Sequence, residues 1–258
     1  MIHPTAIIDP NTKIDQSVEI GAFSVIGANV TILKNCKIAS HVVIEGETLI
    51  GEDNHIYSYA AIGGDPQDLK YNGEQTRLEI GNHNRIREYA TIHRGTIDDH
   101  SVTKIGNHNL LMAYTHVAHD CQLGNHVIMA NNCSLAGHVH LHDWAILGGF
   151  SLVHQFCQIG SHCFTGISTL ITKDIPPYII ANGNPAVPRG INKGGLIRRE
   201  GFNKDNIKVI QQAFKILYLR GHTLTEAKSQ IAELAEIEPK ITTLLDFLEK
   251  SNRSIIRG

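Results

Sequence analysis

The sequence has no apolar run that approaches the roughly 18 residues needed to span a membrane. Its first ten residues, MIHPTAIIDP, lack the charged and apolar regions of a signal peptide. It also lacks an excess of charge of either sign, because 23 Lys and Arg balance 25 Asp and Glu. This balance provides no overall basic field, so any anion site must be local. We therefore expect a cytoplasmic protein with no transmembrane segment and no nucleic-acid partner.

The chain of 258 residues contains an internal repeat of six residues. Counting in sixes from Ile2 reaches eleven isoleucines without a miss, the last at Ile62. The repeat resumes at Ile80 and, after a shift by one residue, runs from Ile105 to Ile171 with Thr165 as its one polar member. A hexapeptide repeat of this length predicts a parallel β-helix whose repeated apolar residues face the core.

Four positions after each repeated residue the side chain is usually small, and all five cysteines take this position. They are Cys36, Cys121, Cys133, Cys157 and Cys163. We interpret them as small buried packing residues, since disulfides are disfavoured in a reducing compartment. Cys121 is thereby removed as a candidate nucleophile.

Two excursions interrupt the repeat, at residues 63–79 and 94–104, and such excursions from a rigid scaffold are where binding residues tend to lie. The repeat ends near two prolines in the sequence NPAVP, which stop strand pairing. The residues that follow have helical spacing. We therefore expect a β-helix over residues 1–188 and a C-terminal α-helical domain over residues 189–258 that closes the open end of the solenoid.

The repeat resembles that of the hexapeptide-repeat acyltransferases, whose left-handed β-helix uses three hexapeptides for one triangular coil of 18 residues. The left hand is implied by this resemblance alone. Successive coils stack roughly 4.8 Å apart, so residues 18 apart lie above one another. Gly137 then lies above His119 and Gln155 above Gly137, while His138 lies above Asp120. This predicts a polar cluster on three successive coils.

The stretch AYTHVAHDCQLGN, residues 113–125, supplies the centre of that cluster. Its spacing alone fits a metal site, a Cys/His nucleophile or a histidine base beside a carboxylate. The whole cluster favours acyl transfer from a thioester to a hydroxyl or amine, with a histidine base, Asp120 in support and the Gly137 N–H as an oxyanion donor. Adjacent strand residues usually project to opposite faces, so a direct hydrogen bond between His119 and Asp120 stays open.

Particular motifs extend the resemblance to one family, the UDP-N-acetylglucosamine O-acyltransferases, which catalyse the first step of lipid A biosynthesis. The motifs are QDLKY (67–71), IHRGT (92–96), HVAHDC (116–121), LAGHV (135–139), VHQFC (153–157) and GNPA (183–186), followed by the helical tail. The resemblance implies a homotrimer that needs no cofactor or metal. It also implies that an acyl chain, often 3-hydroxylated, passes from acyl carrier protein to the glucosamine 3-position of UDP-N-acetylglucosamine.

The resemblance also assigns roles to residues. His119 is the general base, Asp120 supports it and the Gly137 amide is the oxyanion donor. The residues that contact the sugar nucleotide or acyl chain are Asp68, Lys70, His116, His138, His154 and Gln155. The residues that hold the UDP end are Asn192, Arg198 and Arg199, and two guanidiniums are suited to a pyrophosphate.

Two positions depart from the family pattern. Gly194 stands where a relative has an acidic nucleotide ligand, which leaves the uridine contacts open. Ile167 stands where long-chain relatives have glycine, at a position that limits acyl-chain length in the family. We expect Ile167 to select a shorter donor. The sequence does not decide between a 3-hydroxyl and a 3-amino acceptor.

Other classes fit less of the sequence. A γ-class carbonic anhydrase uses a trimeric left-handed β-helix with three zinc-bound histidines, but it explains neither the helical tail nor IHRGT and QDLKY. A non-catalytic solenoid predicts no polar cluster. The related N-acyltransferase of lipid A synthesis and acetyl-CoA-dependent hexapeptide enzymes are the nearest alternatives, although the former usually has an extra N-terminal domain and the latter generally lack this set of motifs.

Overall fold

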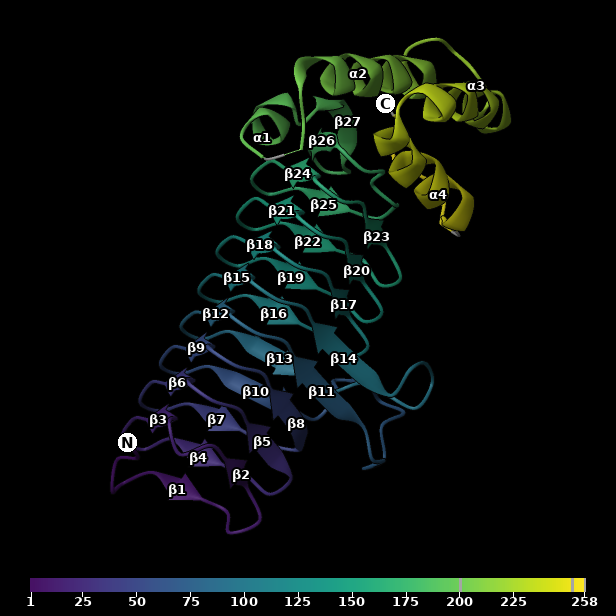
Figure 1. Ribbon diagram of the computed structural model, residues 1–258. Helices are drawn as coiled ribbons and strands as arrows, with labels where there is room; N and C mark the ends of the chain where they lie inside the picture. The colour runs from purple at the N-terminus through teal and green to yellow at the C-terminus, as the bar shows by residue number, and fades with distance from the viewer. Residues whose placement is uncertain (200, 252, 258) are drawn as a thin grey trace.

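The computed structural model describes residues 1–199, 201–251 and 253–257 and shows a column of stacked β-coils with helices at one end (Figure 1). Each coil contributes short strands to three sheets, and strands of successive coils pair in parallel. Ile7 pairs with Val25, so an uninterrupted coil takes 18 residues. The expected parallel β-helix is confirmed.

Three sheets form the faces of the column, named here after their first strands. The β1 face is β1 (Ile7–Ile8), β4 (Val25–Ile26), β7 (Val43–Ile44), β10 (Ala61–Gly64), β13 (Thr91–His93), β16 (His116–Val117), β19 (Ser134–Leu135), β22 (Leu152–Val153) and β25 (Leu170–Ile171). The β2 face is β2 (Lys13–Ile14), β5 (Val30–Ile32), β8 (Glu47–Ile50), β11 (Arg77–Ile80), β14 (Val102–Ile105), β17 (Gln122–Leu123), β20 (His140–Leu141) and β23 (Gln158–Ile159). The β3 face is β3 (Glu19–Ile20), β6 (Lys37–Ile38), β9 (His55–Ile56), β12 (Arg85–Ile86), β15 (Leu110–Leu111), β18 (Ile128–Met129), β21 (Ile146–Leu147), β24 (Phe164–Thr165), β26 (Ile179–Asn182) and β27 (Val187–Ile191).

The interior of the column is filled by the repeated apolar residues and the small residues that follow them. From Ile20 upward the repeated residues are buried, whereas Ile2 in the first coil is 46% exposed. All five cysteines are free and buried, as expected. Burial raises the pKa of the Cys121 thiol to about 12, so it is not a thiolate near neutral pH.

The chain turns between faces with a residue in the left-handed region, at φ between 55° and 72°. Edge 1, between the β1 and β2 faces, carries Asp120, His138 and Phe156 at such turns. Edge 2, between the β2 and β3 faces, carries His126, Trp144 and His162. Edge 3, between the β3 and β1 faces, carries Tyr114, Asn132 and Phe150. Asp, Asn and His are among the residues that tolerate this conformation best.

Aromatic rings stack along edge 2. Ring centroids are 4.7 Å apart for His83 and His108, 4.9 Å for His108 and His126, and 3.9 Å for His126 and Trp144. Several of the 16 histidines are therefore explained by their place on an edge and not by chemistry.

The two excursions are narrower than the sequence suggested. Residues 65–76 and 94–101 form the loops, because residues 77–79 and 102–104 already belong to β11 and β14. At the other end, β27 continues to Ile191, past the expected boundary at residue 188. The reason is that β27 pairs antiparallel with β26, which extends the β3 face beyond the last full coil.

Helices close the upper end of the column (Figure 1). They are α1 (Lys193–Ile197), α2 (Lys204–Tyr218), α3 (Leu224–Ile237), the 3₁₀ helix η1 (Pro239–Ile241) and α4 (Thr242–Lys250). Tyr178 Oη donates to the Lys240 carbonyl at 2.7 Å, and Ser251 Oγ donates to Asp174 at 2.6 Å, so the helices are fixed to the last coils. Within the described residues, none of these helices combines the length and the apolar character that crossing a membrane requires.

Candidate active site

Edge 1 brings the predicted polar residues together. His119 and Asp120 lie between β16 and β17, Gly137 and His138 lie one coil above, and Gln155 lies in the next coil. The stacking of Gly137 on His119 is direct, since a Cβ atom at residue 137 would lie 2.5 Å from His119 Cε1. Glycine is therefore the residue that leaves room for the imidazole ring.

His119 and Asp120 are hydrogen-bonded to each other. The Nδ1 of His119 lies 2.9 Å from Asp120 Oδ2, and the two side chains are 13% and 0% exposed. The strand alternation that left this contact open does not apply, because Asp120 has φ 58° and belongs to the edge turn. A carboxylate only accepts, so Nδ1 carries the proton and Nε2 is left as the basic nitrogen.

Thr96, in the second excursion, holds the Asp120 carboxylate. The Thr96 N–H donates to both oxygens, at 3.0 and 2.9 Å, and its hydroxyl donates to Oδ2 at 2.6 Å. Burial by itself raises the pKa of Asp120, but the hydrogen bonds from His119 and Thr96 outweigh it, so that the pKa lies below its ordinary value. Asp120 is thus a buried anion beside the imidazole. The sequence did not single out Thr96, although IHRGT contains it.

The Gly137 backbone faces the same space with a free donor. Among the residues that the structure describes, none accepts a hydrogen bond from the Gly137 N–H. Its carbonyl accepts from the Phe156 N–H at 3.1 Å, which fixes the peptide. The site therefore offers a basic imidazole nitrogen and an unused backbone N–H side by side.

Two cavities adjoin at His119. The larger, about 1160 Å³, is lined by Gln67, Asp68, Leu69, Lys70, Asp98, Asp99, His119, His138, Gln155 and Phe156. The smaller, about 460 Å³, includes His116, Gly137 and the apolar residues Leu135, Leu152 and Val153. The predicted residues Asp68, Lys70, His116, His138 and Gln155 thus surround His119, as a polar chamber next to a more apolar groove.

Hydrogen bonds fix several of these lining residues. His116 Nδ1 lies 2.7 Å from Thr91 Oγ1, and Lys70 Nζ donates to Asp98 at 3.0 Å, which joins the two excursions. His154 lines neither cavity, and its Nδ1 lies 3.3 Å from Arg253 in the C-terminal tail.

The predicted nucleotide residues lie instead at the two ends of α1, and two of them contact His162 of edge 2. Arg199 reaches His162 Nδ1 at 3.0 Å and lies over the Trp144 ring, 5.0 Å from its centroid, whereas Arg198 is exposed. Burial and the Arg198 charge lower the pKa of Arg199. Asn192 is buried, and its side chain caps α1 at Gly195 and donates to the His162 carbonyl.

Ile167 and Gly194, the two departures from the family pattern, line neither of the cavities at His119. Ile167 lies on edge 3, between β24 and β25, and is 74% exposed. Gly194 has open space where a side chain would begin. One chain therefore distributes the predicted site residues over all three edges.

His119, Asp120 and His138 also have the spacing of metal ligands, with one ligand atom of each within 4.8 Å of the others. The Asp120 oxygens already accept hydrogen bonds from Thr96 and His119. Hydrogen bonding among protein groups is thus sufficient to explain the cluster.

Known proteins match this chain over its whole length. A family model described as "Udp N-acetylglucosamine O-acyltransferase; Domain 2" matches residues 174–256, and one described as "Bacterial transferase hexapeptide (six repeats)" matches residues 11–46 and 103–137. The acyl-[acyl-carrier-protein]–UDP-N-acetylglucosamine O-acyltransferase of Thiobacillus denitrificans is 50% identical over 256 residues, which are 99% of each chain. That of Herminiimonas arsenicoxydans is 51% identical in an alignment of 261 positions that covers 100% of this chain and 99% of its own. The chain belongs to the UDP-N-acetylglucosamine O-acyltransferase family.

Solved structures of UDP-N-acetylglucosamine acyltransferases have the same fold. LpxA from Acinetobacter baumannii is 49% identical, with a TM-score of 0.97 and coverage of 99% of each chain. The Francisella novicida acyltransferase is 42% identical, with a TM-score of 0.98, and covers 100% of this chain and 94% of its own. The expected left-handed β-helix with C-terminal helices is thereby confirmed.

Proposed function

We propose that this protein transfers an acyl chain from acyl carrier protein to the glucosamine 3-position of UDP-N-acetylglucosamine, the first step of lipid A biosynthesis, in the cytoplasm. The observation that carries the proposal is the pairing of a basic His119 Nε2 with the unused Gly137 N–H at the junction of two cavities. The names of relatives about 50% identical over the full length support the substrates.

The geometry supports a direct transfer without an acyl-enzyme. His119 Nε2 removes the proton of the acceptor hydroxyl as its oxygen attacks the thioester carbonyl. The Gly137 N–H stabilises the oxyanion of the tetrahedral intermediate. When the carbon–sulfur bond breaks, the imidazolium returns the proton to the leaving thiolate. The buried Asp120 carboxylate keeps His119 in the required tautomer and stabilises its positive form.

The test is a transfer assay with acyl carrier protein thioesters and UDP-N-acetylglucosamine, in which products are weighed by mass spectrometry. His119→Ala should lower turnover by roughly 10²- to 10⁴-fold. His83→Ala, an edge histidine that lines neither cavity at His119, is the matched control and should remain active. Near-normal turnover of the His119 variant would contradict the assignment, and a product formed only with the 3-amino sugar would change the acceptor.

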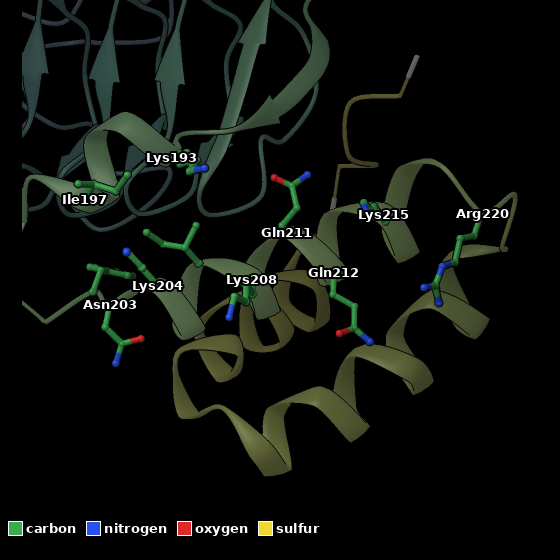
Figure 2. Close-up of a pocket in the computed structure, with 11 residues that line it drawn as sticks. Lys193, Ile197, Asn203, Lys204, Lys208, Gln211, Gln212, Lys215 and Arg220 are labelled. Carbon is green, nitrogen blue, oxygen red and sulfur yellow. The ribbon is translucent and has the colours of Figure 1, made fainter.

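A separate cavity supports docking of acyl carrier protein. It measures about 990 Å³, lies between α1 and α2 and has the apolar residues Ile197, Phe202 and Ile207 in its lining. Figure 2 shows basic side chains around it, namely Lys193, Lys204, Lys208, Lys215 and Arg220. Acyl carrier protein is acidic, so charge complementarity favours this surface.

Charge reversal tests this docking surface. Lys204→Glu combined with Lys215→Glu should raise the KM for acyl carrier protein thioesters, and it should leave the KM for UDP-N-acetylglucosamine unchanged. An acyl-pantetheine thioester, which has no acidic protein surface, is the control substrate. Equal loss with both donors would move the docking surface elsewhere.

We also propose a homotrimer in which neighbouring chains complete each site. The support is the separation of His119 on edge 1 from Arg199 next to edge 2 and Ile167 on edge 3. Co-expressed His119→Ala and Arg199→Ala chains should recover activity that neither has alone, because mixed trimers contain sites with both residues intact. Absence of recovery, or a stable active monomer in sedimentation, would contradict this arrangement.

A further inference from the structure

A second histidine–carboxylate pair lies beside the first. His138 Nδ1 is 2.9 Å from Asp99 Oδ2, with the two side chains 12% and 27% exposed. The His138 ring meets the His119 ring edge to face, with centroids 5.1 Å apart, and stacks on Phe156 with centroids 4.4 Å apart. His138 therefore has neighbours on two sides and a carboxylate at Nδ1.

Asp99 comes from the second excursion and not from the repeat. It lies in the loop between β13 and β14, and its other oxygen is 3.3 Å from His100 Nε2. The neighbouring Asp98 pairs with Lys70 of the first excursion. The loop thus has a defined position above edge 1, with Asp99 directed to His138.

The chemistry of this contact fixes the state of the imidazole. A carboxylate cannot donate a proton unless it is itself protonated, so His138 Nδ1 must donate. In the neutral ring, Nε2 then has a lone pair and accepts from a hydroxyl or an amide N–H. The larger cavity, which His138 lines, would receive a sugar with several such donors under the proposed function.

We propose that Asp99 is a positioning residue for the acceptor substrate: it holds His138 in the Nδ1–H tautomer, so that Nε2 accepts a hydrogen bond from UDP-N-acetylglucosamine. The proposal rests on the proposed function for the identity of that ligand. The same device, a carboxylate that sets the tautomer of a histidine, operates in hydrolytic triads. Asp99 itself does not touch the reacting atoms.

Three variants separate the possible roles of Asp99. Asp99→Ala removes the acceptor at Nδ1, whereas Asp99→Asn keeps an oxygen that accepts from Nδ1–H. Ile97→Ala is the matched loop control, because Ile97 is 58% exposed in the same loop and lines neither cavity.

The first readout is the nitrogen NMR spectrum of ¹⁵N-histidine-labelled protein, in which the His138 signals are assigned by their loss in His138→Gln. The second is the KM for UDP-N-acetylglucosamine at saturating acyl donor.

We expect the Nδ1–H tautomer of His138 in the wild type and in Asp99→Asn, and a shift toward the Nε2–H tautomer in Asp99→Ala. The KM for the sugar nucleotide should rise about tenfold in Asp99→Ala and less than threefold in Asp99→Asn, with a smaller effect on kcat. Ile97→Ala should match the wild type in both readouts.

Persistence of the Nδ1–H tautomer in Asp99→Ala would overturn the proposal, as would a KM that does not follow the tautomer across the variants. The NMR readout needs no turnover. A protein without transferase activity but with the predicted tautomer change would refute the proposed function and leave the Asp99–His138 positioning intact.

Discussion

Gly137→Ala is the substitution whose effect the structure defines most closely. The new Cβ would lie 2.5 Å from Cε1 and 2.7 Å from Nε2 of His119, about 0.9 Å short of the 3.4 Å at which ordinary contact begins. Gly137 does not have a left-handed φ, so alanine is compatible with its backbone. The ring of His119 must therefore move by roughly 1 Å, which is enough to cost about 100-fold in rate, or about 2.7 kcal/mol.

The assay compares kcat and thermal stability for this variant and a matched glycine. Gly149→Ala is the control, because it occupies the same position of its hexapeptide and its Cβ would meet only Asn131 O, at 3.3 Å. Alanine retains the backbone N–H at residue 137, so a loss of activity would report the displaced imidazole and not a lost oxyanion donor. A Gly137→Ala enzyme with wild-type kcat and wild-type thermal stability would refute the placement of His119 as the base.

Three further outcomes follow from other parts of the structure. Thr96→Val should lower the free energy of unfolding at pH 7 by about 2 kcal/mol, since a charged acceptor loses one donor. Measured by urea denaturation, the difference in unfolding free energy between the wild type and Thr96→Val should become smaller as the pH falls through the lowered pKa of Asp120. A difference that does not depend on pH would contradict a role of Thr96 in holding the Asp120 anion. Burial, with nearby positive groups, lowers the pKa of His93 and of His162 to about 4. Between about pH 6.5 and 4 the unfolded chain therefore binds more protons than the folded protein, so the Tm should decrease as the pH is lowered through this range. A Tm that does not change with pH in calorimetry would exclude this. Ile167→Gly should shift donor preference toward longer acyl chains in a thioester series, because the stiff exposed isoleucine is removed, and an unchanged preference would reject Ile167 as the length determinant.

The repeat made much of the site predictable from the sequence. Where no residue is inserted, positions 18 apart lie above one another, so the contact between Gly137 and His119 follows from counting. Burial of the cysteines follows in the same way. Such predictions need no knowledge of side-chain conformation, because backbone pairing between coils fixes the vertical neighbours.

Counting fails where the chain leaves the repeat. Thr96 and Asp99 both lie in the second excursion, 24 residues before Asp120 and 39 before His138, so no multiple of 18 connects them. Their contacts depend on how the loop folds back over edge 1. The hydrogen bond between His119 and Asp120 was left open for another reason, since strand alternation was applied to a residue that has φ 58°.

The edges explain why histidine is both frequent and hard to interpret in this sequence. A turn at positive φ favours Asn, Asp and His on conformational grounds alone, so an edge histidine requires no functional reason. On edge 2, His83, His108 and His126 stack ring on ring. On edge 1, His138 occupies the same kind of turn, but the excursion supplies Asp99 to its Nδ1. His119 likewise gains Asp120, which the excursion holds through Thr96. A carboxylate within hydrogen-bond distance of the ring, and not the histidine itself, therefore distinguishes the edge 1 site from the stacked column of edge 2, where Asp53 lies 3.9 Å from His83.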